Sequence, residues 1–143
     1  MDDNCVPLED ILETVPNIIQ LDIDTNANSF VSHQNAVQKV PSSFKKISLL
    51  HIEKDFNFEE CFKFIQNRQD IELEFRCGRD WPIKVVHSVQ QLTDTLIDAI
   101  LPQFKPPSIY FKGQSKKSKK NLRKLKYSYE KKEKNDKKIE GTI

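Results

Sequence analysis

Glycine is scarce in this chain, which has only Gly78, Gly113 and Gly141 among its 143 residues. A phosphate-binding loop needs several closely spaced glycines, because the backbone must approach the phosphate closely at a tight turn. Three glycines at these distant positions therefore exclude a glycine-rich nucleotide-binding loop.

Cysteine is also rare, and Cys5, Cys61 and Cys77 form an odd number without CxxC spacing. Because the N-terminus also lacks a signal-peptide pattern, we expect an intracellular protein of the nucleus or cytoplasm. Zinc ligands usually pair two to four residues apart, whereas Cys61 and Cys77 lie 16 residues apart and neither His51 nor His87 is paired with them. We therefore predict no metal site and no cofactor.

The two central cysteines have ordinary structural interpretations. Cys61 falls on the apolar face of a predicted helix, where it would act as a small buried hydrophobe. Cys77 lies between Arg76 and Arg79, which would lower the pKa of an exposed thiol, and an unreactive cysteine at the end of a strand is the alternative.

No apolar run approaches the roughly 20 residues that a membrane-spanning helix needs, so we expect no membrane partner. The acidic residues also have structural explanations. Glu59 and Glu60 fall in the first turn of a predicted helix, where negative side chains interact favourably with the helix macrodipole. Glu72 and Glu74 fall on the polar face of a predicted strand. We therefore predict no catalytic residue, no enzymatic activity and no small-molecule substrate.

What the chain does contain is a strong division of charge. Residues 112–143 carry 13 Lys and Arg against 4 Asp and Glu, whereas residues 1–111 carry 10 against 17. Nearly all large apolar residues belong to the acidic part. We predict a folded domain at residues 6–111 followed by a basic tail at residues 112–143.

A clear helix–strand unit occupies the middle of the chain. The apolar positions of its helix follow i, i+3, i+4 and i+7 spacing after a possible N-cap at Asn57, and those of its strand alternate. They are Phe58, Cys61, Phe62 and Ile65 for the helix, and Ile71, Leu73 and Phe75 for the strand. The same order recurs less regularly at residues 8–24, 30–55 and 88–113.

These units predict a mixed α and β fold. In the second strand, the apolar positions are expected at Ile47, Leu50 and Ile52, with Leu49 on the opposite face. "IKVV" is expected to form a short strand before a helix from about Val89. The spacing leaves two arrangements open, a short irregular leucine-rich-repeat-like solenoid and a single small mixed domain without a repeat.

The stretches "LEDILETVPNIIQLDID" and "FKKISLLHIEKD" resemble degenerate leucine-rich repeats that follow an F-box in substrate-adaptor proteins. "AILPQFKPPSIYF" is similar to a segment of the F-box-associated domains expanded in nematodes. The likeness spans roughly residues 8–111 and implies a ubiquitin ligase adaptor that selects proteins for ubiquitination. Only seven residues precede Leu8, so we expect the F-box that recruits the ligase core to be missing.

If the strands form one sheet, their non-core positions share one exposed face. We predict that this face binds a protein partner and prefers a basic one, because acidic residues predominate on it. A solvated face without a binding role is the alternative. The predicted binding residues are Asp22, Asp24, His51, Glu53, Glu72, Glu74 and Tyr110.

The tail is predicted to be disordered, because it has too few apolar residues to offset its ordering entropy. Leu122, Leu125 and Tyr129 nevertheless allow a short amphipathic helix. Its basic cluster is predicted to bind nucleic acid or an import receptor, and alternatives are folding back onto the acidic body or no dedicated function. The residues concerned are Lys116, Lys117, Lys119, Lys120, Arg123, Lys124 and Lys126.

Together these features predict a non-enzymatic protein-interaction module with a protein partner. The alternative is a small nuclear or nucleolar protein that binds nucleic acid through its basic tail.

Overall fold

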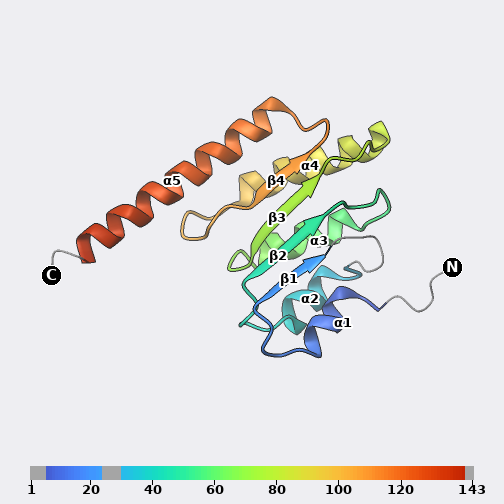
Figure 1. The fold of residues 1–143 in the computed structure, drawn as a ribbon, viewed down its shortest axis with the longest axis horizontal. Coiled ribbons are helices and arrows are strands. Elements are labelled where there is room, and N and C mark those ends of the chain that lie inside the picture. The colour runs from blue at the N-terminus through green and yellow to red at the C-terminus, as the bar shows by residue number, and fades with distance from the viewer. Residues whose placement is uncertain (1–5, 24–29, 141–143) are drawn as a thin grey trace.

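A computed structural model describes residues 6–23 and 30–140, with side chains described as far as residue 135. Cys5 and the predicted face residue Asp24 lie outside the described residues. Helices and strands alternate along the chain (Figure 1). The helices are α1 (Leu8–Glu13), α2 (His33–Lys39), α3 (Phe58–Asn67), α4 (Ile83–Ala99) and α5 (Lys116–Glu140). The strands are β1 (Gln20–Ile23), β2 (Lys46–Leu50), β3 (Glu72–Cys77) and β4 (Ser108–Phe111).

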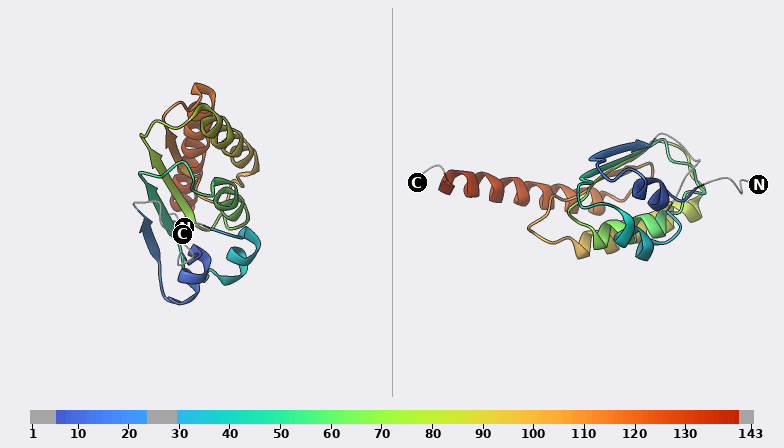
Figure 2. Two further views of the ribbon diagram at one scale, coloured as in Figure 1. Left: turned by 90° about the vertical axis from the view of Figure 1, so that its right-hand side faces the viewer. Right: turned by 90° about the horizontal axis from the view of Figure 1, so that it is seen from below.

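The four strands form one parallel sheet whose order, β1-β2-β3-β4, follows the order of the chain. Helices α1 to α4 lie side by side on one face of this sheet (Figure 2), and each packs on the next. Helix α5 instead lies at the β4 end and its C-terminal half projects away from the body. The predicted mixed α and β fold is thus confirmed, with strands alternating with helices.

The central unit folds as its two periodicities predict. The Asn57 side chain accepts a hydrogen bond from the backbone N–H of Glu60 at 3.3 Å, which caps α3. The four predicted apolar residues of this helix are buried, as are Ile71, Leu73 and Phe75 in and before β3.

Aromatic side chains fill much of the space between the sheet and the helices. Phe30 stacks on Phe64 with ring centroids 4.9 Å apart. A second group of rings surrounds Phe75 and extends to the last strand. It consists of Phe56, Phe58, Phe62, Phe75, Trp81 and Phe111.

In β2 the predicted burial of Ile47 and Ile52 is confirmed, but the choice of Leu50 over Leu49 as the third buried residue is wrong. Leu49 is only 1% exposed, because it lies in register with Ile23 on one side and Phe75 on the other, in the apolar row. Leu50 is half-buried at the end of the strand. The following residue, His51, has φ of 53°, and this left-handed turn interrupts the alternation before the buried Ile52.

The expected "IKVV" strand is also wrong, because these residues form the first turn of α4. Pro82 precedes the helix, a position at which its missing N–H costs no helical hydrogen bond. Val85 and Val86 pack against the core at helical spacing with the buried Val89. Their β-branched side chains favour a strand locally, but burial along one helix face decides the conformation.

The sequence left two states open for the basic tail, a disordered segment and a short amphipathic helix, and the described part of it is helical. From Lys116 it forms helix α5, whose first turns pack on β4 and α4 and bury Ser118 and Leu122. The Ser115 hydroxyl accepts a hydrogen bond from the Ser118 N–H at 3.1 Å, in the manner of an N-cap. Tertiary contact at the end of the sheet therefore supplies stabilisation that composition alone does not reveal.

Candidate functional site

The outer face of the sheet, opposite the helices, carries alternate residues of each strand. Four of the predicted face residues lie on it, Asp22 in β1, Glu72 and Glu74 in β3, and Tyr110 in β4. The parallel register places Glu72 opposite Lys46 and Glu74 opposite Ser48. None of the described helices covers this face (Figure 2).

Cations from β2, β3 and the loop before β4 accompany the acids of β3. The Lys46 Nζ lies 3.9 Å from Glu72 and 3.7 Å from Glu74. Lys105, from the loop before β4, approaches Glu72 at 2.6 Å, and this hydrogen bond raises the pKa of Lys105. Arg76 lies 3.7 Å from Glu74. The acidic row therefore sits in a set of ion pairs.

The other two predicted face residues lie beyond the end of β2. His51 is exposed in the left-handed turn, and Glu53 follows it. A carboxylate oxygen of Glu53 accepts a hydrogen bond from Arg79 at 2.8 Å. These two residues form the rim of the sheet face.

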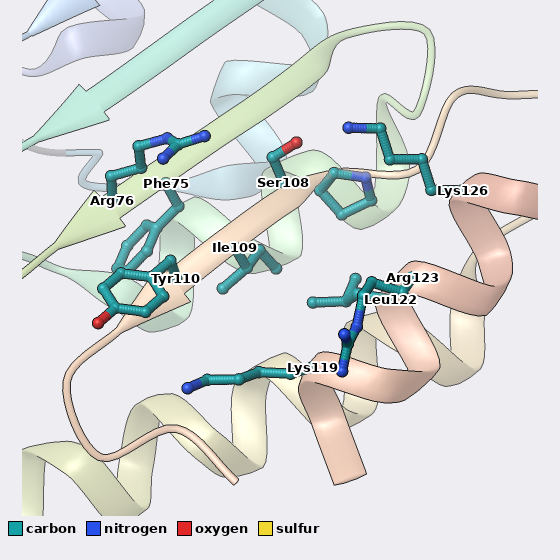
Figure 3. Close-up of a pocket in the computed structure, with 10 residues that line it drawn as sticks. Phe75, Arg76, Ser108, Ile109, Tyr110, Lys119, Leu122, Arg123 and Lys126 are labelled. Atoms are coloured by element: carbon teal, nitrogen blue, oxygen red, sulfur yellow. The ribbon is translucent and has the colours of Figure 1, made fainter. Parts of the chain in front are cut away.

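The predicted basic residues divide between two sides of α5. Lys119, Arg123 and Lys126 point toward β4, where they line a groove (Figure 3). The other predicted residues, Lys116, Lys117, Lys120 and Lys124, are exposed and do not line it. The three residues that line the groove follow i, i+4 and i+7 spacing, which places them on one side of a helix. This spacing was the sequence signal that could have distinguished them from the other basic residues.

The groove between β4 and α5 has a cavity volume of about 370 Å³. Apolar side chains of Ile109 and Leu122 contribute to its lining, together with the cations of α5 and Arg76. The Lys119 ammonium lies 5.3 Å from the centroid of the Tyr110 ring, a cation–π contact. None of the ten lining residues is acidic.

The cysteines are placed as core residues. Cys61 is fully buried, and this burial raises the pKa of its thiol to about 12. Cys77 is buried too, and its thiol donates to the Ile52 carbonyl at 3.3 Å. Over the described ranges, no three His, Cys, Asp or Glu side chains converge as a metal site.

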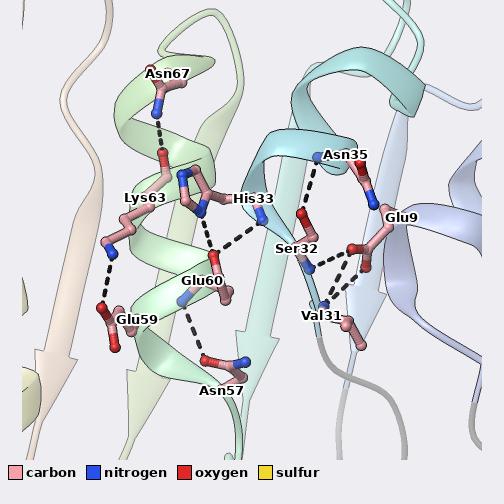
Figure 4. A network of polar contacts seen from close by, with 10 residues as sticks. All are labelled: Glu9, Val31, Ser32, His33, Asn35, Asn57, Glu59, Glu60, Lys63 and Asn67. Atoms are coloured by element: carbon pink, nitrogen blue, oxygen red, sulfur yellow. Dashed lines mark hydrogen bonds and ion pairs between the residues drawn. The ribbon is translucent and has the colours of Figure 1, made fainter.

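A network of polar contacts fixes the start of α2 (Figure 4). The buried Glu9 carboxylate accepts hydrogen bonds from the N–H groups of Val31 and Ser32, at 3.2 and 2.7 Å. Glu60 accepts from the His33 N–H at 3.0 Å and also contacts the His33 ring. Burial alone would raise the pKa of Glu60, but these hydrogen bonds outweigh it and lower the pKa. The network joins three helices and has a structural role.

Comparison with known proteins finds no match to this chain among family models, curated proteins or solved structures. Of the helices in the described residues, none is both long and apolar enough to cross a membrane. The candidate surfaces are therefore interpreted from their own geometry and charge.

Proposed function

We propose that the chain is a non-enzymatic protein-interaction module whose outer sheet face binds a protein partner. The observation that carries the proposal is an all-parallel sheet with one uncovered face. Parallel sheets are ordinarily covered on both faces. Leucine-rich repeats are an exception, because they stack strands in chain order and use the bare face for recognition. The strand order and one-sided helices support such a leucine-rich-repeat-like stack.

The proposed partner contributes basic groups to Glu72 and Glu74. The cations now near them are half-exposed, and exposed ion pairs stabilise a fold by only about 0 to 1 kcal/mol. A partner cation can therefore replace Lys46 or Lys105 at little cost. A role in selecting proteins for ubiquitination rests on the family resemblance alone and stays a prediction.

The test compares two full-length variants that each lose two carboxylates. The first is Glu72→Gln with Glu74→Gln on the outer face, and the second is Glu59→Gln with Asp98→Asn on the exposed side of the helix layer. Proteins captured by the wild type are purified and titrated against both variants.

We expect the outer-face variant to bind at least about tenfold more weakly and the helix-layer variant to bind normally. Equal affinity of the two variants for every purified partner would contradict the proposal. Matching melting temperatures show that neither variant has lost its fold.

A second candidate function is nucleic-acid binding by α5, favoured by one specific observation. Residues 116–126 hold seven Lys and Arg and no acid, and they lie on a helix that packs against the body. Such a row releases counterions from a phosphate backbone, so binding should weaken steeply as salt rises. Salt-titrated binding of generic RNA and DNA to the full chain tests this function, and absence of binding at low salt contradicts it.

A further inference from the structure

The groove between β4 and α5 combines three properties. It has an apolar floor, a cationic wall and a half-exposed aromatic ring. Ile109 and Leu122 belong to the floor, while Lys119, Arg123 and Lys126 form the wall on the α5 side (Figure 3). Tyr110, from β4, is 48% exposed.

The cations of the groove are poorly neutralised. Among the described residues, Arg123 and Lys126 contact no carboxylate. Arg76, on the opposite side, has only a loose ion pair with Glu74 at 3.7 Å. Like charges held close together repel one another, so an anion that enters between them is favoured. The groove is therefore suited to a ligand that carries phosphate or carboxylate groups.

The aromatic ring narrows the class of anion. Tyr110 presents a large exposed ring at the wall, next to apolar floor residues, and Lys119 lies 5.3 Å from its centroid. A planar base can stack on such a ring, and a nearby cation adds to the attraction of a negatively charged nucleotide. An acidic peptide would use the cations but has no planar group to place on Tyr110.

The size of the groove favours a single strand over a duplex. Its cavity volume of about 370 Å³ lies at the small end of the range for ligand pockets, roughly 300 to 1,000 Å³. In a duplex the base faces are stacked inside and cannot reach an apolar floor, whereas unpaired bases can be splayed out and stacked on aromatic side chains.

We propose that the groove between β4 and α5 binds a nucleotide unit of single-stranded nucleic acid, with its base on Tyr110 and its phosphates on Lys119, Arg123 and Lys126. This inference rests on the second proposed function, nucleic-acid binding by α5, and names the site and the form of nucleic acid.

The test uses the full chain and two matched triple variants of α5. The groove variant is Lys119→Gln, Arg123→Gln and Lys126→Gln. The opposite-side variant is Lys117→Gln, Lys120→Gln and Lys124→Gln, which removes the same charge from exposed positions outside the groove. Fluorescence anisotropy measures binding of a labelled single-stranded oligouridylate of about eight nucleotides, a typical site size, across about 50 to 200 mM salt.

We expect the groove variant to lose at least about tenfold in affinity and to reduce the salt slope by roughly 2, since each phosphate contact contributes about 0.7. The opposite-side variant should lose less than about threefold by the same electrostatic reasoning. Tyr110→Leu should lose between about fivefold and a hundredfold, because it removes the stacking ring, while Tyr110→Phe should bind normally.

Other ligands decide between the remaining interpretations. Three other ligands are titrated in parallel: duplex RNA of the same length as the oligouridylate, uridine monophosphate, and polyglutamate as an acidic peptide. Equal affinity for duplex, equal affinity for the mononucleotide or tighter binding of polyglutamate would each overturn the proposal.

The variants also separate this inference from the function on which it rests. If both triple variants lose affinity equally and Tyr110→Leu has no effect, α5 binds nucleic acid through diffuse charge and the groove proposal fails. If the wild type does not bind any nucleic acid at low salt, both proposals fail.

Discussion

The layer formed by α1, α2 and α3 and the end formed by β4 and α5 are held together by different interactions. In the layer, charged side chains bond to neighbouring segments, as Glu9 does with Ser32 and Arg68 does with the Val40 carbonyl at 2.8 Å. At the α5 end the described hydrogen bonds join uncharged groups and Leu122 is buried, while one cation, Lys119, lies over the Tyr110 ring. These charges of the layer form hydrogen bonds within the fold, whereas Arg123 and Lys126 of α5 form no ion pair with the described residues.

The largest effect should come from the aromatic core of the layer. Phe64 is fully buried and stacks on Phe30, so Phe64→Ala should lower the free energy of unfolding by about 3 to 5 kcal/mol. Urea unfolding followed by fluorescence of the half-buried Trp81 measures this change. The control is Tyr127→Ala on α5, at a position 68% exposed, which should change stability by less than about 0.5 kcal/mol. A similar loss of unfolding free energy in both variants would mean that the two regions contribute equally to stability.

The next effect concerns the guanidinium of Arg68. It donates to the carbonyls of Val40 and Pro41 and to both carboxylate oxygens of Asp70. The hydrogen bonds from Arg68 hold the pKa of Asp70 below its usual value.

Arg68→Ala should destabilise the protein by about 2 to 3 kcal/mol, because these carbonyls and a carboxylate lose their partner. Arg68→Lys should retain little of this stability, since an ammonium group cannot reproduce the planar set of donors of the guanidinium. Arg123→Ala on α5 is the control. A loss of stability there as large as for Arg68→Ala would contradict the difference between the helix layer and α5. Thermal unfolding of the three variants measures the order of their stabilities.

A smaller effect is expected at the turn that leads into α5. Gly113 has φ of 91°, and an added Cβ would lie 3.1 Å from the Cγ1 atom of Val86 on α4. Gly113→Ala should therefore cost about 1 to 2 kcal/mol.

Hydrogen exchange should show the loss of protection mainly in the first turns of α5, with α3 unchanged. The control is Gly78→Ala, where an added Cβ meets nothing within 4 Å. Equal loss of protection in α3 and α5 would show that α5 is not a separately attached element.

The sequence predicted best where two periodicities were clear and a turn residue separated them. The α3–β3 unit meets both conditions, with Asn57 as the cap. In β2, by contrast, Leu49 and Leu50 are both apolar, so alternation could not decide which one points inward. The register with β1 and β3 decides it, and register is a tertiary property.

The sequence allowed a short amphipathic helix in the tail but did not decide between it and disorder, for a related reason. Composition describes the average polarity of a segment, whereas the open end of the sheet requires only a few buried positions, such as Ser118 and Leu122. The acids Glu72 and Glu74 were placed correctly on one strand face, but Lys105 comes from a distant loop. No local pattern could reveal that ion pair or the groove.

The smallest effect should appear on acidification. Glu60 has its pKa lowered from the ordinary value of 4.5 by the His33 contacts, so its contribution to stability is present above about pH 4.5 and declines as the pH falls through the folded-state pKa. The pair is about one-quarter exposed, which limits the effect through solvent screening.

Unfolding midpoints of the wild type should therefore fall between neutral pH and about pH 3.5, and Glu60→Gln should flatten part of this decline. Glu59→Gln, one residue away but exposed and bonded to Lys63, should leave the decline unchanged. The described α5 contacts to β4 and α4 contain no carboxylate, so the burial of Leu122 should persist over the same range. If exchange in α5 accelerated before exchange in α2, acid would be acting on the end of the molecule, and the assignment of ionic stabilisation to the helix layer would be wrong.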